Sequence, residues 1–390
     1  MNRLRAYFDY NANAPLLPVA RAAVVDALDL AANASSVHAE GRKAREIVSR
    51  ARGFVANLCA AQPADVIFTS GATEAANHVL TPDFRMGRAP VRLSHLYMGA
   101  IEHPCIIAGG RFAAADITKL GVDPTGIIDL AALESTLAQR AADSGSFMLA
   151  LQLANNETGV IQPVRRAADI VHAAGGILVV DAVQAAGRLP LDIGKLGADF
   201  LILSAHKMGG PKGAGALVSK GEAFMPVSLV AGGGQEKGHR GGTENVAAIA
   251  GFGAAAEHAR TTPDAFVSVG KMRNALEARM ATRAPDLIIH GRDADRLPNT
   301  IYFALPGLKA ETAQIAFDME GIAVSAGSAC SSGKVGQSHV LAAMGADTEL
   351  GAIRASLGPQ TSTEEVELFF NAFAKINERR LSRLAAEKAA

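Results

Sequence analysis

Cysteine is scarce in this sequence, and its three cysteines are far apart. Cys59, Cys105 and Cys330 form no CxxC pair. A disulfide framework needs cysteines that can pair, and a cysteine-rich zinc site needs closely spaced ones. The spacing argues against both, so we expect a reducing compartment and no metal site.

Long apolar runs and an excess of charge of one sign are also missing. No apolar stretch reaches the length of a membrane-spanning helix, and the first residues, MNRLRAYFDYNANAPL, contain no apolar signal core. Among 390 residues, 38 basic side chains balance 38 acidic ones, and no basic cluster could follow a polyanion. We therefore expect a cytoplasmic protein of about two domains that binds neither membrane nor nucleic acid.

What the sequence does have is an alternation of strand and helix patterns from about residue 65 to residue 220. This alternation predicts an α/β fold whose mainly parallel sheet has helices on both faces. We expect one of its strands at Val91 to Tyr97. The pattern changes near residue 262 to a smaller α+β unit that ends in a long helix from Thr363 to about Arg383. The predicted large domain is 15–258, and the small domain combines 1–14 with 259–390.

The stretch DFLILSAHKMGGPKGAGAL, residues 199–217, centres on a lysine. An apolar strand from Phe200 to Leu203 runs directly into Ser204, His206 and Lys207. Lysine is rarely buried unless it is paired or chemically engaged, so this position indicates a reactive amine. A surface lysine on a loop is the alternative that this stretch alone leaves open.

Other polar side chains follow the ends of the predicted parallel strands, where α/β proteins bind ligands. Asp181 ends a Val-rich strand, and an isolated carboxylate there needs a cation. Ala72 and Thr73 open a helix whose free N–H groups suit a phosphate, although a simply capped turn explains the same residues. His103 precedes Pro104 at a strand-to-helix junction. The whole set at this edge is Thr73, His103, Asn156, Asp181, Gln184, Ser204, His206 and Lys207.

The cysteines receive different interpretations. Cys59 lies at the apolar end of a helix, and we expect Cys105 to pack beneath the helix that follows His103. Cys330 lies in SAGSACSSGKVGQSHV, a run of Ser and Gly with almost no apolar anchor. That setting indicates an exposed, functional thiol.

An amine, a facing carboxylate, a phosphate-ready helix start and an imidazole together form a coherent site for pyridoxal phosphate. The lysine would form a Schiff base, and the carboxylate would keep the pyridine nitrogen protonated.

The motifs that surround these residues resemble one family along the whole chain. They are FDYNANAP, SSVHAEGRKA, FTSGATEAAN, EHP, NNETG, VDAVQ, SAHKMGGPKG, GGGQEKGHRGGTEN, SAGSAC and IRASLG. The sequence is similar to cysteine desulfurases of the NifS/IscS type, class V aminotransferase-like enzymes of pyridoxal-phosphate fold type I. The resemblance implies a large domain with a seven-stranded sheet and a smaller α+β domain that carries the nucleophilic cysteine.

The resemblance also implies roles for single residues. Lys207 would carry the cofactor, Asp181 would pair with the pyridinium nitrogen, Gln184 would bind the ring hydroxyl, and His103 would stack on the ring and transfer protons. The remaining roles are cofactor binding by Ala72 and Asn156, phosphate binding by Thr73, Ser204 and His206, with Thr243 contributed by the partner of a homodimer, and substrate binding by Asn156 and Arg354.

In the implied reaction, the Cys330 thiolate takes sulfur from L-cysteine, leaves L-alanine, and passes the persulfide sulfur to an acceptor such as an iron–sulfur scaffold. Three positions depart from the family pattern: Ala231 replaces a histidine, Asn13 replaces a threonine, and SSGKVGQS follows Cys330. The last change lies where partners bind, so the acceptor stays open.

Two other functions remain as alternatives. Another class V enzyme, such as a selenocysteine lyase or an aminotransferase, would keep Lys207 and Asp181 without needing Cys330. A sulfur-relay scaffold without turnover would not need the intact Lys, Asp, Gln and His set.

Overall fold

Seven strands form the central sheet of the structure, a computed structural model that describes residues 5–141, 143–326 and 337–389. In spatial order they are β2 (Val66–Thr69), β10 (Gly215–Ser219), β9 (Phe200–Ser204), β8 (Ile177–Asp181), β7 (Phe147–Gln152), β5 (His95–Gly99) and β6 (Ile117–Leu120). Only β10 is antiparallel to its neighbours in this sheet. The prediction of a mainly parallel seven-stranded sheet is confirmed.

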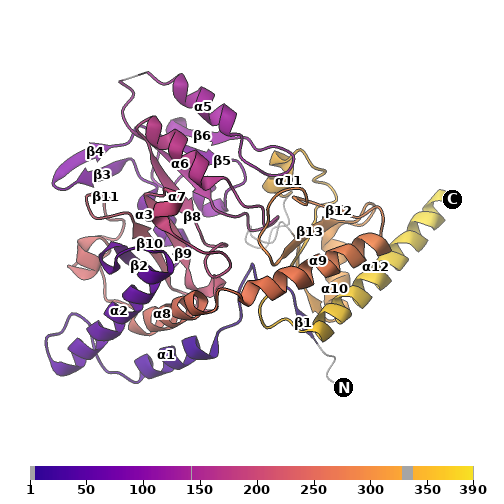
Figure 1. Cartoon of the computed structure of the whole chain (residues 1–390), viewed down its shortest axis with the longest axis horizontal. Helices are drawn as coiled ribbons and strands as arrows, with labels where there is room; N and C mark the ends of the chain where they lie inside the picture. Colours follow the sequence, from indigo (N-terminus) through magenta and orange to yellow (C-terminus); the bar gives the residue numbers. More distant parts are fainter. Residues whose placement is uncertain (1–4, 142, 327–336, 390) are drawn as a thin grey trace.

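Helices cover both faces of this sheet (Figure 1) because its central strands are apolar on both sides. On one face, Leu149 and Leu178 belong to a core shared with α1, α2, α5, α6 and α8. On the other, Met148 and Val179 pack with α3 and α4. These helices are α1 (Pro18–Leu28), α2 (Ala39–Leu58), α3 (Ala72–Val79), α4 (Pro104–Ile107), α5 (Leu130–Ala138), α6 (Val164–Ala173), α7 (Ile193–Leu196) and α8 (Val246–Thr261).

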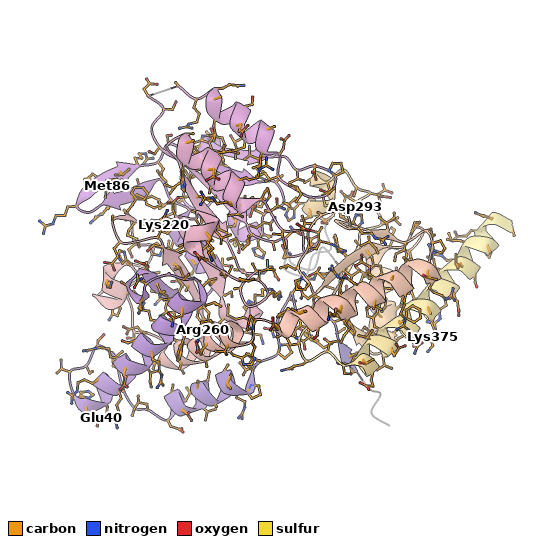
Figure 2. The ribbon with its side chains drawn as sticks, in the orientation of Figure 1. Glu40, Met86, Lys220, Arg260, Asp293 and Lys375 are labelled. Atoms are coloured by element: carbon orange, nitrogen blue, oxygen red, sulfur yellow. The ribbon has the colours of Figure 1, made fainter. Side chains whose placement is uncertain are left out.

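One expected strand is divided in two. The segment predicted as a single strand, Val91 to Tyr97, forms the end of β4 (Ala89–Arg92) and the start of β5. β4 pairs with β3 (Asp83–Met86), which also pairs with β11 (Phe224–Pro226), in a small antiparallel sheet. Met86 lies at the outer edge of this sheet and points away from the body of the molecule (Figure 2), with 59% of its surface exposed. The prediction was wrong because a local apolar pattern does not reveal the bend between two sheets.

A second hydrophobic core joins the start of the chain to its last third. Ala6 and Phe8 pack with residues from Val269 to Ile376. Its elements are β1 (Ala6–Tyr7), α9 (Ala265–Arg283), β12 (Ile288–Ile289), β13 (Thr300–Ala304), α10 (Ala310–Met319), β14 (Ile322–Ala323), β15 (Ser325–Ala326), β16 (Ile353–Ser356) and α12 (Thr363–Ala389). The short helix α11 (His339–Ala343) packs through Val340 against Ile101 instead. This separate core supports the proposed division into 15–258 and 1–14 with 259–390.

The terminal helix α12 follows the outside of this second core beside α9 and α10 (Figure 1). Val366, Phe369, Phe373 and Ile376 of this helix are buried in the second core, and Phe370 is partly buried. On its outer side, Lys375 (Figure 2) donates to Glu320 at 3.0 Å. Within the described part of the chain, no helix combines the length and the apolar character needed to cross a membrane.

Candidate active site

A cavity of about 530 Å³ opens at the carboxyl ends of the parallel strands. Most of its lining residues come from the large sheet and its connections. Arg354 of β16, a strand of the second core, also lines it. The predicted site residues that line it are Ala72, Thr73, His103, Asn156, Asp181, Gln184, Ser204, His206, Lys207 and Arg354. One edge of the sheet therefore brings together residues that are far apart in the sequence.

Lys207 lies on a short 3₁₀ turn, Ala205–Lys207, directly after β9. Its Nζ donates to two main-chain carbonyl oxygens, of Asn11 at 2.7 Å and of Ala12 at 2.8 Å. The amine is thus held at the cavity wall by the N-terminal segment. Sequence reasoning did not assign Asn11 a role, because a backbone carbonyl has no side-chain signature.

Asp181 ends β8 and is buried. One of its oxygens accepts the main-chain N–H of Val183 at 2.9 Å. Burial raises the pKa of Asp181 to about 6, and the charge of Lys207 opposes part of this rise. A buried carboxylate that faces a cavity is well suited to a cationic ligand atom.

His103 caps the short helix α4, and its Nδ1 accepts the main-chain N–H of Cys105 at 3.2 Å. A ring nitrogen that accepts this bond has no proton, so Nε2 carries the proton of the neutral ring. Burial, reinforced by the charges of Lys207 and His339, lowers the pKa of His103 to about 4. His103 is therefore neutral at pH 7, with Nε2 as the atom that can exchange a proton.

Cys105 does not pack beneath the helix as expected. It lines the cavity, and its Sγ lies 3.0 Å from Nδ1 of His103. Burial and the nearby carboxyl groups of Asp181 and Glu102 raise its pKa to about 12. Cys105 is therefore a thiol, and it gives His103 a second donor.

The cavity end next to β2 has the features that a phosphate requires. No side chain caps the first turn of α3, so its N–H groups remain available. Glu74 in that turn would repel an anion, but Arg240 holds it with bonds of 2.9 and 3.3 Å. His206 and Lys212 line the same cavity, and Asn13 lies 3.1 Å from Nδ1 of His206.

Arg354 occupies the opposite end, where both of its terminal nitrogens are hydrogen bonded to protein oxygens. Its guanidinium donates to Asp9 at 2.8 Å, to Ser325 at 3.1 Å and to the carbonyl of Asn156 at 2.9 Å. Ser325 also donates to Asp9 at 2.9 Å. The planar donor group is thus held in place before any carboxylate arrives.

A buried carboxylate joins the two cores beside this end. Glu157, in the turn after β7, accepts the hydroxyl of Tyr302 at 2.8 Å and that of Ser338 at 2.7 Å. Tyr302 belongs to β13, and Ser338 caps α11. Burial raises the pKa of Glu157, while both hydroxyl bonds oppose that rise.

One predicted residue that the structure describes, Thr243, does not line the cavity. Thr243 lines a neighbouring pocket with Arg240 and Ser70. Its phosphate role across a dimer therefore stays a prediction. Cys330 lies outside the described residues, so its role also stays a prediction.

With this geometry established, the relatives can be compared. The chain matches the family described as Aminotransferase class-V over residues 6–369. It belongs to this family.

Similar class V proteins are known from several organisms. A cysteine desulfurase of Frankia sp. (strain EuIK1) is 38% identical and covers 92% of this chain and 88% of its own length. A cysteine desulfurase of Cereibacter sphaeroides is 36% identical and covers 98% of this chain and 99% of its own length. The X-ray structure of a NifS-like protein from Rickettsia africae ESF-5 has a TM-score of 0.86 and 31% identity. The match covers 96% of this chain and 100% of that protein. The predicted resemblance to the NifS/IscS type and to fold type I is confirmed.

Class V enzymes of this type use pyridoxal phosphate, which is therefore the cofactor of this chain. The cavity fits it. Asp181 is a buried carboxylate without a basic side chain bonded to it, which suits a protonated pyridine nitrogen. The uncapped start of α3 suits the phosphate. Lys207 lines the same cavity as these two features and is the amine that would bind the aldehyde carbon.

Proposed function

We propose that this chain is a cysteine desulfurase that converts L-cysteine to L-alanine and transfers the sulfur to its own Cys330. The observation that supports this function best is one cavity with three parts: a phosphate-ready helix start, the Lys207 and Asp181 pair, and a pre-oriented Arg354. A small amino acid whose carboxylate meets Arg354 would place its amino group toward Lys207.

Bound pyridoxal phosphate supplies an electron sink that stabilises negative charge on the substrate carbons. Lys207 would hold the cofactor, and Asp181 would keep its ring nitrogen protonated. Gln184 would bind the ring oxygen, and Ala72, Thr73, Ser204 and His206 would hold its phosphate. Asn156 and Arg354 would orient the substrate carboxylate.

His103 has a specific part because Nδ1 accepts the N–H of Cys105. In this tautomer Nε2 would act toward the substrate as a hydrogen-bond donor. Nε2 could accept a proton only in the other tautomer, with the ring proton on Nδ1, and the bond from the N–H of Cys105 opposes that tautomer.

The sulfur step balances with the groups of the protein and substrate alone. The Cys330 thiolate attacks the sulfur of cysteine, an S–S bond forms, and the Cβ–S bond breaks. The electron pair of that bond stays on Cβ, which takes a proton and becomes the methyl group of alanine. Cysteine and one thiol thus yield alanine and one persulfide, without an external oxidant or reductant.

The partners follow from this function. We propose a homodimer in which Thr243 of one subunit reaches the phosphate of the other, and a sulfur-acceptor protein such as an iron–sulfur scaffold. A reducing, cytoplasmic location is consistent with Cys59 and Cys105, which are both free thiols.

The deciding experiment incubates the purified yellow protein anaerobically with L-cysteine and a reductant, and follows alanine and sulfide together. We expect equal amounts of both, and loss of both in Cys330→Ala. Cys59→Ala is the matched control, because Cys59 lies in the core away from the cavity and should keep full activity.

Alanine without dependence on Cys330 would point instead to a selenocysteine lyase-like reaction. Amino-group exchange with a keto acid would indicate an aminotransferase. A persulfide carried without turnover would indicate a sulfur-relay scaffold.

A further inference from the structure

Arg188 is a buried charge that the proposed mechanism does not use. It follows β8 in the turn that carries Gln184, and only 6% of its surface is exposed. Its Nη1 donates to the side-chain Oε1 of Gln184 at 3.0 Å and to the main-chain oxygen of the same residue. Its Nη2 donates to the carbonyls of Tyr10 at 3.3 Å and Lys207 at 3.4 Å.

All these partners are neutral oxygens. Within the described ranges, no carboxylate forms an ion pair with Arg188, although fourteen other arginines do form such pairs. Burial lowers the pKa of Arg188 to about 9, and the charge of Arg354 adds to this effect. An uncompensated buried charge is costly, so a purely structural role would be served better by an apolar residue.

The contacts of Gln184 resolve which way its amide points. The two ends of an amide look alike, and they are told apart by their hydrogen-bond partners. Arg188 can only donate, so the amide oxygen must face it. On the other side, Nε2 of Gln184 donates to the carbonyl of Asn11 at 3.0 Å, a group that can only accept. The second N–H of this amide is therefore the one left for a ligand.

We propose that Arg188 is a positioning residue that fixes the Gln184 amide with its NH₂ toward the cofactor. Gln184 then donates to the ring oxygen of pyridoxal phosphate and favours the ionised form of that oxygen. The inference rests on the proposed cofactor role of Gln184. Without Arg188, the amide could rotate and present its oxygen, which would repel the ionised form.

The test measures the cofactor spectrum, not turnover. The yellow band reports the form with an ionised ring oxygen, and the near-ultraviolet band reports the form with a protonated one. In Arg188→Met we expect the ratio of yellow to near-ultraviolet absorption to fall about tenfold, which corresponds to the loss of one hydrogen bond to a charged acceptor. Arg188→Lys keeps a donor-only cation and should restore most of the yellow form.

A double-mutant cycle separates positioning from general structure. In a Gln184→Ala background, Arg188→Met should cause no further change in the ratio. An unchanged ratio in the single variant, or an equal further fall in the double variant, would overturn the proposal. If no variant, nor the wild type, bound the cofactor, the proposed function itself would fail.

A second variant covers the case in which Arg188→Met does not fold. Gln184→Glu gives Arg188 a carboxylate, which should stay ionised from about pH 5 to pH 9 beside the guanidinium. It cannot donate, so the yellow form should fall as in Gln184→Ala. A wild-type spectrum in Gln184→Glu would mean that Arg188 does not control the group at position 184, and the proposal would be wrong.

Discussion

The two ends of the cavity handle buried charge in opposite ways. At the cofactor end, Asp181 is buried without an oppositely charged side chain bonded to it among the described residues, and the same holds for Arg188, which lies behind Gln184. At the substrate end, Arg354 already pairs with Asp9 at 2.8 Å. Unpaired buried charge lowers stability, and paired charge does so much less. The cofactor end is therefore arranged for a ligand that supplies the missing charge, whereas the substrate end must exchange one partner for another.

The largest effect should come from removing the amine. Lys207→Ala should abolish alanine formation and the yellow colour together, because it removes the amine that forms the covalent link to the cofactor. Absorption spectra and product assays measure both. A yellow variant with normal turnover would contradict the assignment of Lys207.

Asp181→Asn should separate function from stability. Turnover should fall at least a hundredfold, since the ring nitrogen loses its ionic partner. The cofactor-free variant should nevertheless be more stable than the wild type above pH 6. The pKa of Asp181 is about 6 in the folded chain, which is above its value in the unfolded chain. The wild type therefore has its full unfolding free energy below pH 4 and loses about 3 kcal/mol of it as the pH rises through 6.

Urea unfolding of both cofactor-free proteins at pH 4 and pH 8 tests whether the variant is the more stable one above pH 6. The two should unfold at similar urea concentrations at pH 4, and the variant should be more resistant at pH 8. Equal resistance at pH 8 would mean that Asp181 carries no penalty, and the contrast between the two ends would disappear.

At the substrate end, Arg354→Lys should act on substrate binding alone. A lysine cannot reproduce the planar donor pair, so KM for L-cysteine should rise about tenfold to a hundredfold. The yellow band should stay unchanged, because Arg354 is held by Asp9 and Ser325 and not by the cofactor end. A changed spectrum with an unchanged KM would show that the two ends are not independent.

The smallest effect should come from removing one of the two hydrogen bonds that the buried Glu157 carboxylate accepts from hydroxyl groups. Ser338→Ala removes one of the two hydroxyl donors of Glu157 and should cost about 1 to 2 kcal/mol of unfolding free energy. Tyr302 still donates, so the site should keep its spectrum. Denaturant unfolding measures the loss. If the variant were more stable than the wild type, Glu157 would be an uncompensated buried charge, as Asp181 is.

Much of the site could be predicted because parallel strands end at one edge. Asp181, Lys207 and His103 each follow a clear apolar strand, and topology alone brings them together. The division of Val91 to Tyr97 could not be predicted, since it depends on pairing with distant strands.

The positions of three other residues were not predicted, for different physical reasons. Asn11 acts through its main-chain oxygen, which any residue carries. Arg188 looks like an ordinary surface arginine until its burial is known. Cys105 was assigned to the core because cysteine usually packs there.

The pairing of the first strand with one of the last also determines when the site can form. β1 pairs with β14, and Arg354 holds Asp9, so the N-terminal segment finds its place only after most of the chain has been synthesised. The carbonyls of Asn11 and Ala12 that hold Lys207 lie on that segment. A growing chain on the ribosome therefore cannot assemble this cavity early, and contacts between such distant residues form slowly. We therefore expect a product truncated before β14 to lack the arrangement that holds Lys207 at the cavity wall.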